Sequence, residues 1–192
     1  MDLDAFYNSE FEQHQITLNN TRHQLLDNFS RLIKISANAV REGNKLLFFG
    51  NGGSAGDCQH IAAELGVRYT SERDPIAAIA LTTDTSVLTA IANDRSFNDL
   101  FARQLDAIGQ PGDVAIAIST SGMSKNILRG LEMARRKNLI TIGFSGHSGG
   151  KMAELCDLLI PVPSDITARI QEMHILLGHM FCGALEQELE LL

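Results

Sequence analysis

The chain has no tryptophan, four prolines and only three cysteines among its 192 residues. Without tryptophan it lacks the usual indole platform for stacking sugars or bases, although neither ligand is excluded. Cys58, Cys156 and Cys182 are widely spaced and form no C-x-x-C pair, which indicates neither a disulfide framework nor a thiolate zinc site. We therefore expect reduced thiols that are mostly buried.

Long apolar runs and clusters of positive charge are absent as well. No apolar stretch approaches the roughly 18 residues that span a bilayer, and the N-terminus (Met1 to Asp4) lacks the pattern of a signal peptide. Sixteen basic and 23 acidic side chains give a net charge of −7, without any run of Lys or Arg. Such a chain is poorly suited to bind nucleic acid or an anionic membrane surface. We expect a cytoplasmic protein whose partner is a small molecule or another protein.

The pattern of apolar residues predicts an alternating α/β chain that begins with a long helix. Residues 2–42 carry an amphipathic helical stripe that ends at Gly43-Asn44, with apolar residues at Leu25, Leu26, Phe29, Leu32, Ile33 and Val40. Beyond it, short runs rich in β-branched or aromatic residues predict five buried strands, at 45–49, 77–81, 114–118, 140–144 and 158–162.

Helical patterns lie between these runs, at residues 97–108 and 127–134. Strands that alternate with helices predict right-handed βαβ crossovers and a five-stranded parallel sheet with helices on both faces. Residues 167–192 predict a last helix that is apolar nearly all round near residues 175–181. We expect one domain, with a helical segment at 1–43, an α/β core at 44–165 and a C-terminal helix at 166–192. The first and last helices are expected to pack between the subunits of a homo-oligomer.

Two loops that follow predicted strands have the form of an anion cradle. The first is Gly50-Asn51-Gly52-Gly53-Ser54-Ala55-Gly56, and the second is Ser119-Thr120-Ser121-Gly122-Met123-Ser124. Each precedes a helix, whose N-terminal N–H groups and dipole favour an anion, while hydroxyls can donate to phosphate oxygens. The alternative is that these residues only cap helices and form turns.

Motifs that are missing from the first loop exclude or disfavour some classes of phosphate ligand. There is no Gly-Lys-Ser/Thr sequence, which excludes a P-loop NTPase. Gly50-x-Gly52-x-x-Ala55 satisfies a loose dinucleotide pattern, but the nearest acidic residue, Asp84, lies 34 residues after Gly50 where about 20 are expected. A nicotinamide cofactor is therefore disfavoured. Four hydroxyls in the second loop suit a single phosphate monoester.

Histidine, glutamate and glutamine side chains form a second constellation on two predicted helices. His60 and Glu64 are four residues apart and share a face, as do Gln171 and His179, eight residues apart, with His174 between them. Each histidine taken alone is more often an ordinary core or surface residue. Two nitrogens and two oxygens from facing helices could bind zinc, and a glutamate with a histidine can act as an acid/base pair. The sequence does not decide whether the two faces meet.

Several motifs in order resemble the sugar isomerase (SIS) domain family and, within it, the phosphoheptose isomerases. They are the Gly-Asn-Gly-Gly-Ser loop, Ala92-Asn93-Asp94, the Ser119 to Ser124 loop, Gly149-Gly150-Lys151-Met152 and Arg169-Ile170-Gln171-Glu172-Met173-His174. The resemblance covers essentially the whole chain and implies a single SIS domain with a flavodoxin-like, Rossmann-like three-layer fold. Met123, where Asn is frequent, and Ala168, where some isomerases have an acidic residue, depart from the pattern.

The resemblance implies isomerisation of sedoheptulose 7-phosphate to D-glycero-D-manno-heptose 7-phosphate through an enediolate, in heptose biosynthesis for lipopolysaccharide, by a homotetramer. It implies acid/base catalysis by Glu64 and His179 and one zinc ion bound by His60, Glu64, Gln171 and His179. The implied substrate contacts are Asn51, Gly52, Gly53, Ser54, Glu64, Asn93, Asp94, Ser119, Thr120, Ser121, Ser124 and Gln171. The family also contains a non-catalytic relative, associated with a replication initiator, that binds another protein. That role and a sugar-phosphate sensor are the alternatives.

Overall fold

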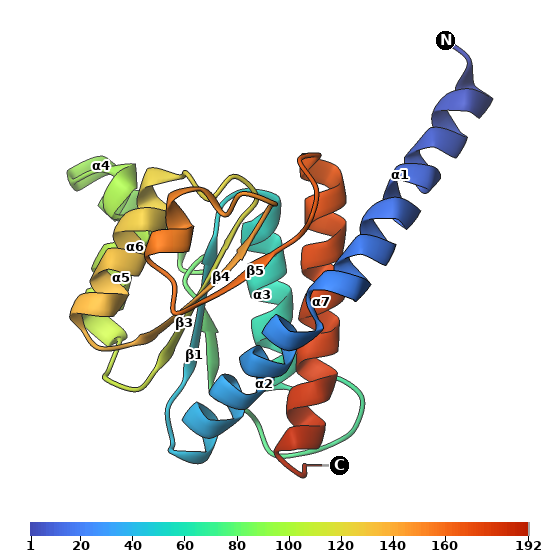
Figure 1. Ribbon diagram of the computed structural model, residues 1–192. Helices are drawn as coiled ribbons and strands as arrows, with labels where there is room; N and C mark the ends of the chain where they lie inside the picture. The colour runs from blue at the N-terminus through green and yellow to red at the C-terminus, as the bar shows by residue number, and fades with distance from the viewer. Residues whose placement is uncertain (192) are drawn as a thin grey trace.

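A single parallel sheet with the strand order β2-β1-β3-β4-β5 forms the centre of the computed structural model (Figure 1). The structure describes residues 1–191. Its strands are β1 (Leu46–Gly50), β2 (Ala78–Ala80), β3 (Val114–Ser119), β4 (Ile140–Ser145) and β5 (Leu158–Pro161). Its helices are α1 (Leu3–Gln24), α2 (Leu26–Arg41), α3 (Gly53–Gly66), α4 (Thr85–Asp94), α5 (Leu100–Ile108), α6 (Lys125–Arg136) and α7 (Thr167–Glu188), with short 3-10 turns η1 (Phe97–Asp99) and η2 (Gly150–Glu154).

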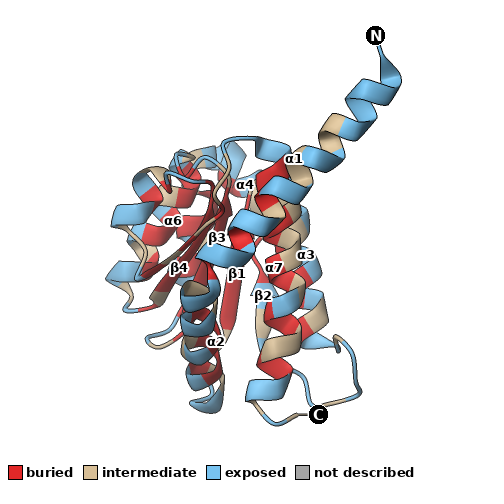
Figure 2. Ribbon diagram, turned by 45° about the vertical axis from the view of Figure 1, so that its right-hand side comes forward, coloured by how far each residue is buried: buried red, intermediate tan, exposed pale blue. Residues whose placement is uncertain are grey.

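The apolar strands are buried because helices cover both faces of the sheet (Figure 2). Alternate residues point to opposite faces, so Leu46 and Phe48 of β1 join the core under α2, α3 and α7. Leu47 and Phe49 of the same strand join the second core, under α5 and α6. The three-layer α/β fold predicted from the sequence is therefore confirmed.

The first helix differs from the prediction, because the chain turns at Leu25 and divides it into α1 and α2. Leu25 leaves the helical conformation, with φ −105° and ψ 4°, and its side chain is buried. The turn lets α2 pack on the sheet while α1 extends along α7 and beyond it (Figure 1). No proline or glycine marks this break, so the continuous apolar stripe concealed it.

Three further details differ from the predictions. Strand β2 has only three residues and lies at the edge of the sheet, where Ile79 is 41% exposed, so it is not a buried strand. Helix α7 ends at Glu188. Helix α4 was not predicted, and it is capped by the preceding residue, Asp84, whose side chain accepts a hydrogen bond from the Val87 N–H at 3.0 Å. Asp84, the acidic residue considered above for a dinucleotide-binding pattern, therefore caps a helix.

Cys58 and Cys182 are buried and Cys156 is half-buried, and all three are free thiols. Burial is the main reason that the pKa of Cys156 and that of Cys182 rise to about 12. Thiols that stay protonated at neutral pH are poor nucleophiles and poor metal ligands. Within residues 1–191, no helix is long and apolar enough to cross a membrane.

Candidate active site

The two predicted anion loops lie next to each other where the strand order reverses. Strand β1 pairs with β2 on one side and with β3 on the other, so the loops after β1 and β3 lie at the reversal of strand order, which is where open α/β sheets bind ligands. Asn51 and Asn126 join them through two reciprocal side-chain hydrogen bonds of 2.9 and 2.8 Å. A side chain at Gly50 would lie 2.9 Å from Ser54 and 3.0 Å from the Ile118 carbonyl, so only glycine allows this approach.

The glycine loop leaves the start of α3 open to a ligand. Gly52 adopts φ +57°, which favours glycine, and it precedes α3 without a side-chain cap from any of residues 1–191. The first N–H groups of the helix have no partner within the helix. The loop therefore presents backbone donors and the positive end of the α3 dipole, as an anion site requires.

The hydroxyls of the second loop have two roles. Ser119 Oγ accepts a hydrogen bond from the Gly122 N–H and Ser121 Oγ from the Met123 N–H, both at 3.2 Å. These contacts match the turn-forming role, but each hydroxyl proton is still free to donate to a ligand. Ser124 stands at the start of α6 and makes no capping bond with its side chain to any of residues 1–191. The loop is both a stabilised turn and a set of donors.

The Gly149-Gly150-Lys151-Met152 motif packs against the backbone of this loop. The Met152 N–H donates to the Gly122 carbonyl at 3.2 Å, and the Gly146 N–H donates to the Thr120 carbonyl at 2.9 Å. A Cβ atom at Gly122 would lie 2.0 Å from the Gly149 carbonyl oxygen, so a side chain cannot be accommodated there. The motif therefore stabilises the 119–124 loop through backbone contacts, although it is not itself one of the two anion loops.

The faces of α3 and α7 that carry the histidines and Glu64 meet. His60 Nε2 lies 3.0 Å from His179 Nε2 and 3.4 Å from Glu64 Oε1. The two helices approach closely at Gly178, where a Cβ atom would lie 2.6 Å from Ile61. His60 and Glu64 side chains are 49% and 29% exposed, so the group is open to a ligand.

Gln171 lies apart from that group. Its side-chain nitrogen is 3.1 Å from the position of a Cβ atom at Gly53, which places it at the glycine loop. Eight residues of helix separate it from His179, or roughly 12 Å along the axis. Within residues 1–191, no three or more His, Cys, Asp or Glu side chains are arranged to hold a metal ion. The predicted four-ligand set is therefore not assembled in this arrangement.

Asn93 and Asp94 lie at the exposed end of α4, and Asn93 Nδ2 donates to Asp94 Oδ1 at 2.7 Å. Within residues 1–191, neither side chain makes a hydrogen bond to the two anion loops. The structure therefore does not bring this pair into direct contact with the other predicted site residues.

Sequence reasoning missed three side chains at or near the site. Asp57 is half-buried one turn before His60; burial raises its pKa above the usual range, while the charges of His60 and His179 partly oppose this. Tyr69 stacks on His179, with ring centroids 5.9 Å apart and planes at 23°. Asn126 joins the two loops. The spacing of Asp57 and His60 could have revealed the first, but no local signal pointed to the others.

His174 is a packing residue. It is fully buried, and its Nε2 lies 3.1 Å from the Ser145 carbonyl oxygen. Burial lowers its pKa to about 4, although the hydrogen bond to Ser145 opposes this. The imidazole is therefore neutral near pH 7. Because it is buried, it cannot contact a ligand in the way that His60 and His179 can.

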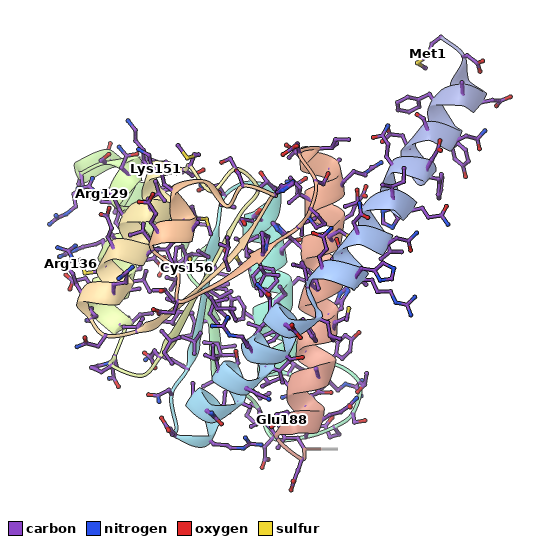
Figure 3. The ribbon with its side chains drawn as sticks, in the orientation of Figure 1. Met1, Arg129, Arg136, Lys151, Cys156 and Glu188 are labelled. Atoms are coloured by element: carbon purple, nitrogen blue, oxygen red, sulfur yellow. The ribbon has the colours of Figure 1, made fainter. Side chains whose placement is uncertain are left out.

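A groove of about 700 Å³ lies elsewhere, on the outer side of α5 and α6. Five arginine and three acidic side chains line it, and Arg129 and Arg136 project from α6 on that side of the molecule (Figure 3). None of the predicted site residues belongs to it. Its charges include an ion pair between Arg129 and Asp99 at 2.8 Å.

Comparisons with known proteins agree with the motifs. The SIS domain model matches residues 11–146. A phosphoheptose isomerase from Paramagnetospirillum magneticum is 51% identical over 186 residues, or 97% of each chain. The solved phosphoheptose isomerase from Francisella tularensis has a TM-score of 0.95 and 35% identity, covering 97% of this chain and 100% of that one. The one from Neisseria gonorrhoeae has a TM-score of 0.91 and 37% identity, covering 96% and 99%. The chain therefore belongs to the SIS domain family and, within it, to the phosphoheptose isomerases.

Proposed function

We propose that this chain converts sedoheptulose 7-phosphate to D-glycero-D-manno-heptose 7-phosphate, in the cytoplasm, and supplies heptose for lipopolysaccharide. The observation that carries the proposal is the meeting of His60, Glu64 and His179, because the helix that carries the first two begins at the glycine loop. A protein-binding module or a sugar-phosphate sensor needs the loops but has no use for an acid/base pair next to them. The isomerase is therefore favoured over both alternatives.

The phosphate is expected to bind at the start of α6, where Ser119, Thr120, Ser121 and Ser124 supply hydroxyl donors. The sugar would then extend past the glycine loop and Gln171 toward His179. Asn93 and Asp94 remain proposed contacts to the sugar, although they lie at the exposed end of α4. Holding the phosphate at one end positions the reacting carbons at the other.

The reaction is a proton shuttle between neighbouring carbons. Glu64 would remove a proton from C1 of the ketose while His179 protonates the carbonyl oxygen at C2, which forms the enediol through an enediolate-like state. Glu64 would then return its proton to C2, and His179 would take the proton from the oxygen at C1. No atoms are gained or lost, and both side chains end in their starting states.

The test is turnover of sedoheptulose 7-phosphate by the pure protein and by Glu64→Gln. Glutamine keeps the size of the side chain but cannot act as a base, so kcat should fall roughly 10²- to 10⁴-fold with a smaller change in KM. Exchange of the C1 proton in deuterated water should be lost as well. Glu72→Gln, an exposed carboxylate change in the following loop, is the control. Wild-type exchange in a folded Glu64→Gln protein would show that another residue is the base.

We also propose that the site binds one zinc ion per chain. His60 Nε2 lies 3.0 Å from His179 Nε2 and 3.4 Å from Glu64 Oε1, and imidazole nitrogens and carboxylate oxygens are the ligand types that zinc prefers. These side chains would have to reorient to surround an ion, because no three of them are arranged to hold one within residues 1–191. Gln171 would have to turn from the glycine loop to complete the set. Bound zinc would supply a Lewis acid that stabilises negative charge on substrate oxygens. Metal analysis after loading and dialysis should find one zinc per chain, and none in His60→Ala/His179→Ala; the control is His147→Ala, at an exposed histidine.

We propose that the protein is a homotetramer that uses α1 for assembly. Helix α1 extends away from the rest of the chain (Figure 1), and one of its faces exposes the apolar side chains Leu3, Phe6, Tyr7 and Phe11. Its direction is set by contacts with α7, where Arg169 Nη1 donates to the Glu10 carbonyl at 2.7 Å and His14 pairs with Glu172 at 2.7 Å. A continuous exposed apolar stripe of this kind is typical of an interface.

A further inference from the structure

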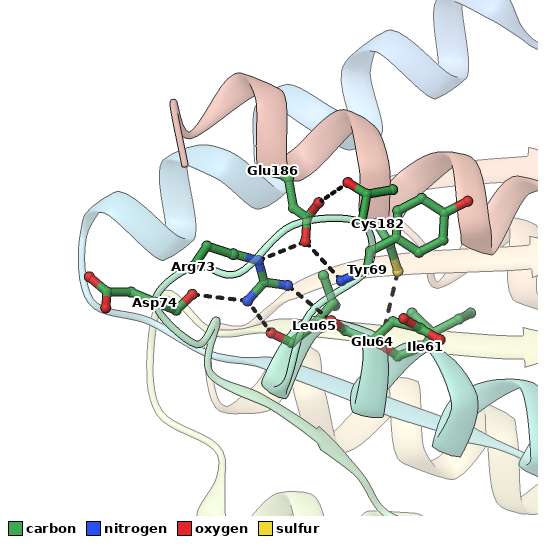
Figure 4. Close-up of polar contacts among 9 residues, drawn as sticks. Ile61, Glu64, Leu65, Tyr69, Arg73, Asp74, Cys182 and Glu186 are labelled. Atoms are coloured by element: carbon green, nitrogen blue, oxygen red, sulfur yellow. Dashed lines mark hydrogen bonds and ion pairs between the residues drawn. The ribbon is translucent and has the colours of Figure 1, made fainter. Parts of the chain in front are cut away.

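The loop of residues 67–77, between α3 and β2, is bound to α7 by a buried carboxylate. Glu186 accepts hydrogen bonds from the Tyr69 N–H at 2.9 Å, from Thr70 Oγ1 at 3.1 Å and from Arg73 Nε at 2.7 Å (Figure 4). Burial acts to raise the pKa of Glu186, but the hydrogen bonds and the charge of Arg73 outweigh it and hold the pKa below its usual range. The carboxylate is therefore ionised and fully paired.

Arg73 also binds the end of α3. Its Nη2 donates to the Glu64 carbonyl at 2.9 Å and its Nη1 to the Leu65 carbonyl at 2.8 Å. These are carbonyls of the last helical turn, which lack partners within the helix. The side chains of Arg73 and Glu186 are 1% and 0% exposed, so this cap is rigid. One arginine thus connects the turn of α3 that carries Glu64 with α7 two turns beyond His179.

This anchoring places the ring of Tyr69 over His179. The two rings are nearly parallel, at 23°, with centroids 5.9 Å apart. The ring of His60 lies against His179 as well, edge-on, with centroids 5.0 Å apart. Gly183 makes room for the tyrosine, because a Cβ atom there would lie 3.1 Å from Tyr69 Cε1. The imidazole of His179 is therefore in contact with two neighbouring rings, and both restrict its rotation.

We propose that Tyr69 is a positioning residue that holds the imidazole of His179 in its working orientation. This proposal rests on the proposed isomerase function. A histidine ring rotates in a broad, roughly two-fold well, so a partly exposed imidazole needs packing to keep one orientation. The stacked tyrosine supplies that packing, and it does so with its ring rather than its hydroxyl. Loss of the ring should therefore slow the chemistry without weakening the phosphate contacts at the other loop.

The test compares Tyr69→Ala with Tyr69→Phe. Tyr69→Ala should lower kcat roughly ten- to hundredfold, as expected for a misplaced catalytic group, with KM changed less than about twofold. Tyr69→Phe should restore kcat, because it keeps the ring. Val67→Ala, at a 69% exposed position in the same loop, is the matched control and should behave as wild type. Tyr69→Leu covers the case in which the alanine variant does not fold.

A second measurement does not depend on turnover. The ring protons of His179, identified as the histidine NMR signals missing from His179→Gln, should keep their NOE contacts with the ring of His60 in Tyr69→Phe and lose them in Tyr69→Ala and Tyr69→Leu. Unchanged NOE contacts in Tyr69→Ala and Tyr69→Leu, a wild-type kcat in Tyr69→Ala, or a raised KM with an unchanged kcat would each overturn the proposal. A wild-type protein that does not turn over sedoheptulose 7-phosphate would contradict the proposed function instead, and the NMR signals would still decide whether Tyr69 holds His179.

Discussion

At the scale of single residues, the hydroxyls of the 119–124 loop combine two roles that the sequence presented as alternatives. Ser119 and Ser121 accept backbone N–H groups in the turn and still have protons to donate. A phosphate at this loop would accept those protons. The same atoms can therefore preserve the turn before the ligand binds and bind the ligand afterwards.

The double variant Ser119→Ala/Ser121→Ala should raise KM for the sugar phosphate roughly 10²- to 10⁴-fold, because two hydrogen bonds to a charged group are lost and each is worth about 1.5–3 kcal/mol. The variant should also lose about 1 kcal/mol of stability for each turn contact. Steady-state kinetics measures the first effect, with Ser30→Ala on the exposed side of α2 as the control. An unchanged KM would remove the phosphate from this loop.

His174 should make stability depend on pH in a defined direction. Burial lowers its pKa from 6.5 to about 4. The unfolded chain therefore binds the proton more tightly than the folded chain. The contribution of His174 to the free energy of unfolding is complete above about pH 6.5 and is lost as the pH falls toward 4. The difference corresponds to about 3 kcal/mol.

His174→Gln keeps a donor for the Ser145 carbonyl but does not titrate. Urea unfolding of both proteins at pH 7.5 and pH 4.5 should therefore show a smaller loss of stability in the variant. His147→Gln, at an exposed histidine, should behave as wild type. Equal losses in all three proteins would show that His174 does not carry this dependence.

At the scale of elements, the Asn51 and Asn126 pair connects the loop after β1 to the start of α6 across the point where the strand order reverses. Removing either partner takes two hydrogen bonds from the other amide, although Asn126 Oδ1 would keep the one from the Ile127 N–H at 3.0 Å. Asn126 is 2% exposed, so water cannot readily replace the lost contact on its side. Such a loss costs about 1–3 kcal/mol.

The variants Asn51→Ala and Asn126→Ala should therefore each destabilise the protein, and the double variant should cost clearly less than the sum of the two. Urea unfolding of the four proteins in this cycle gives the interaction energy, which we expect to be about 1–2 kcal/mol. Asn38→Ala, on the exposed side of α2, combined with Asn126→Ala provides an additive control. Additive losses for the Asn51 and Asn126 pair would mean that the two loops are positioned independently.

At the scale of the whole molecule, the first turns of α1, up to residue 8, are exposed, and only Thr17 and Thr21 of this helix are buried (Figure 2). Charges placed on its apolar face should therefore prevent assembly without unfolding the α/β core. Phe6→Glu/Phe11→Glu should elute as a smaller species than wild type in size-exclusion chromatography with light scattering. Asn19→Glu, on another face of α1, is the control. A monomeric wild-type protein would contradict the proposed tetramer.

The sequence by itself determined the features that depend on near neighbours. Continuous apolar runs predicted the strands, their alternation with helices predicted a parallel sheet, and glycine and hydroxyl residues after two strands predicted the anion loops. The order of the strands in the sheet was not predicted, because the apolar pattern of a helix does not show which face of the sheet that helix covers. Even the edge position of β2 needed the assembled sheet, since its residues are as apolar as those of an inner strand.

Only the tertiary structure decided how distant residues meet. Gln171 and His179 share a helix face in the sequence pattern, yet Gln171 lies at the glycine loop and His179 beside His60, because the helix rises about 1.5 Å per residue. Arg73 and Glu186, 113 residues apart, meet because α3 and α7 pack closely at Gly178. Periodicity reports which side of an element is apolar, whereas the relative position of two elements depends on the packing of their side chains, which no local pattern encodes.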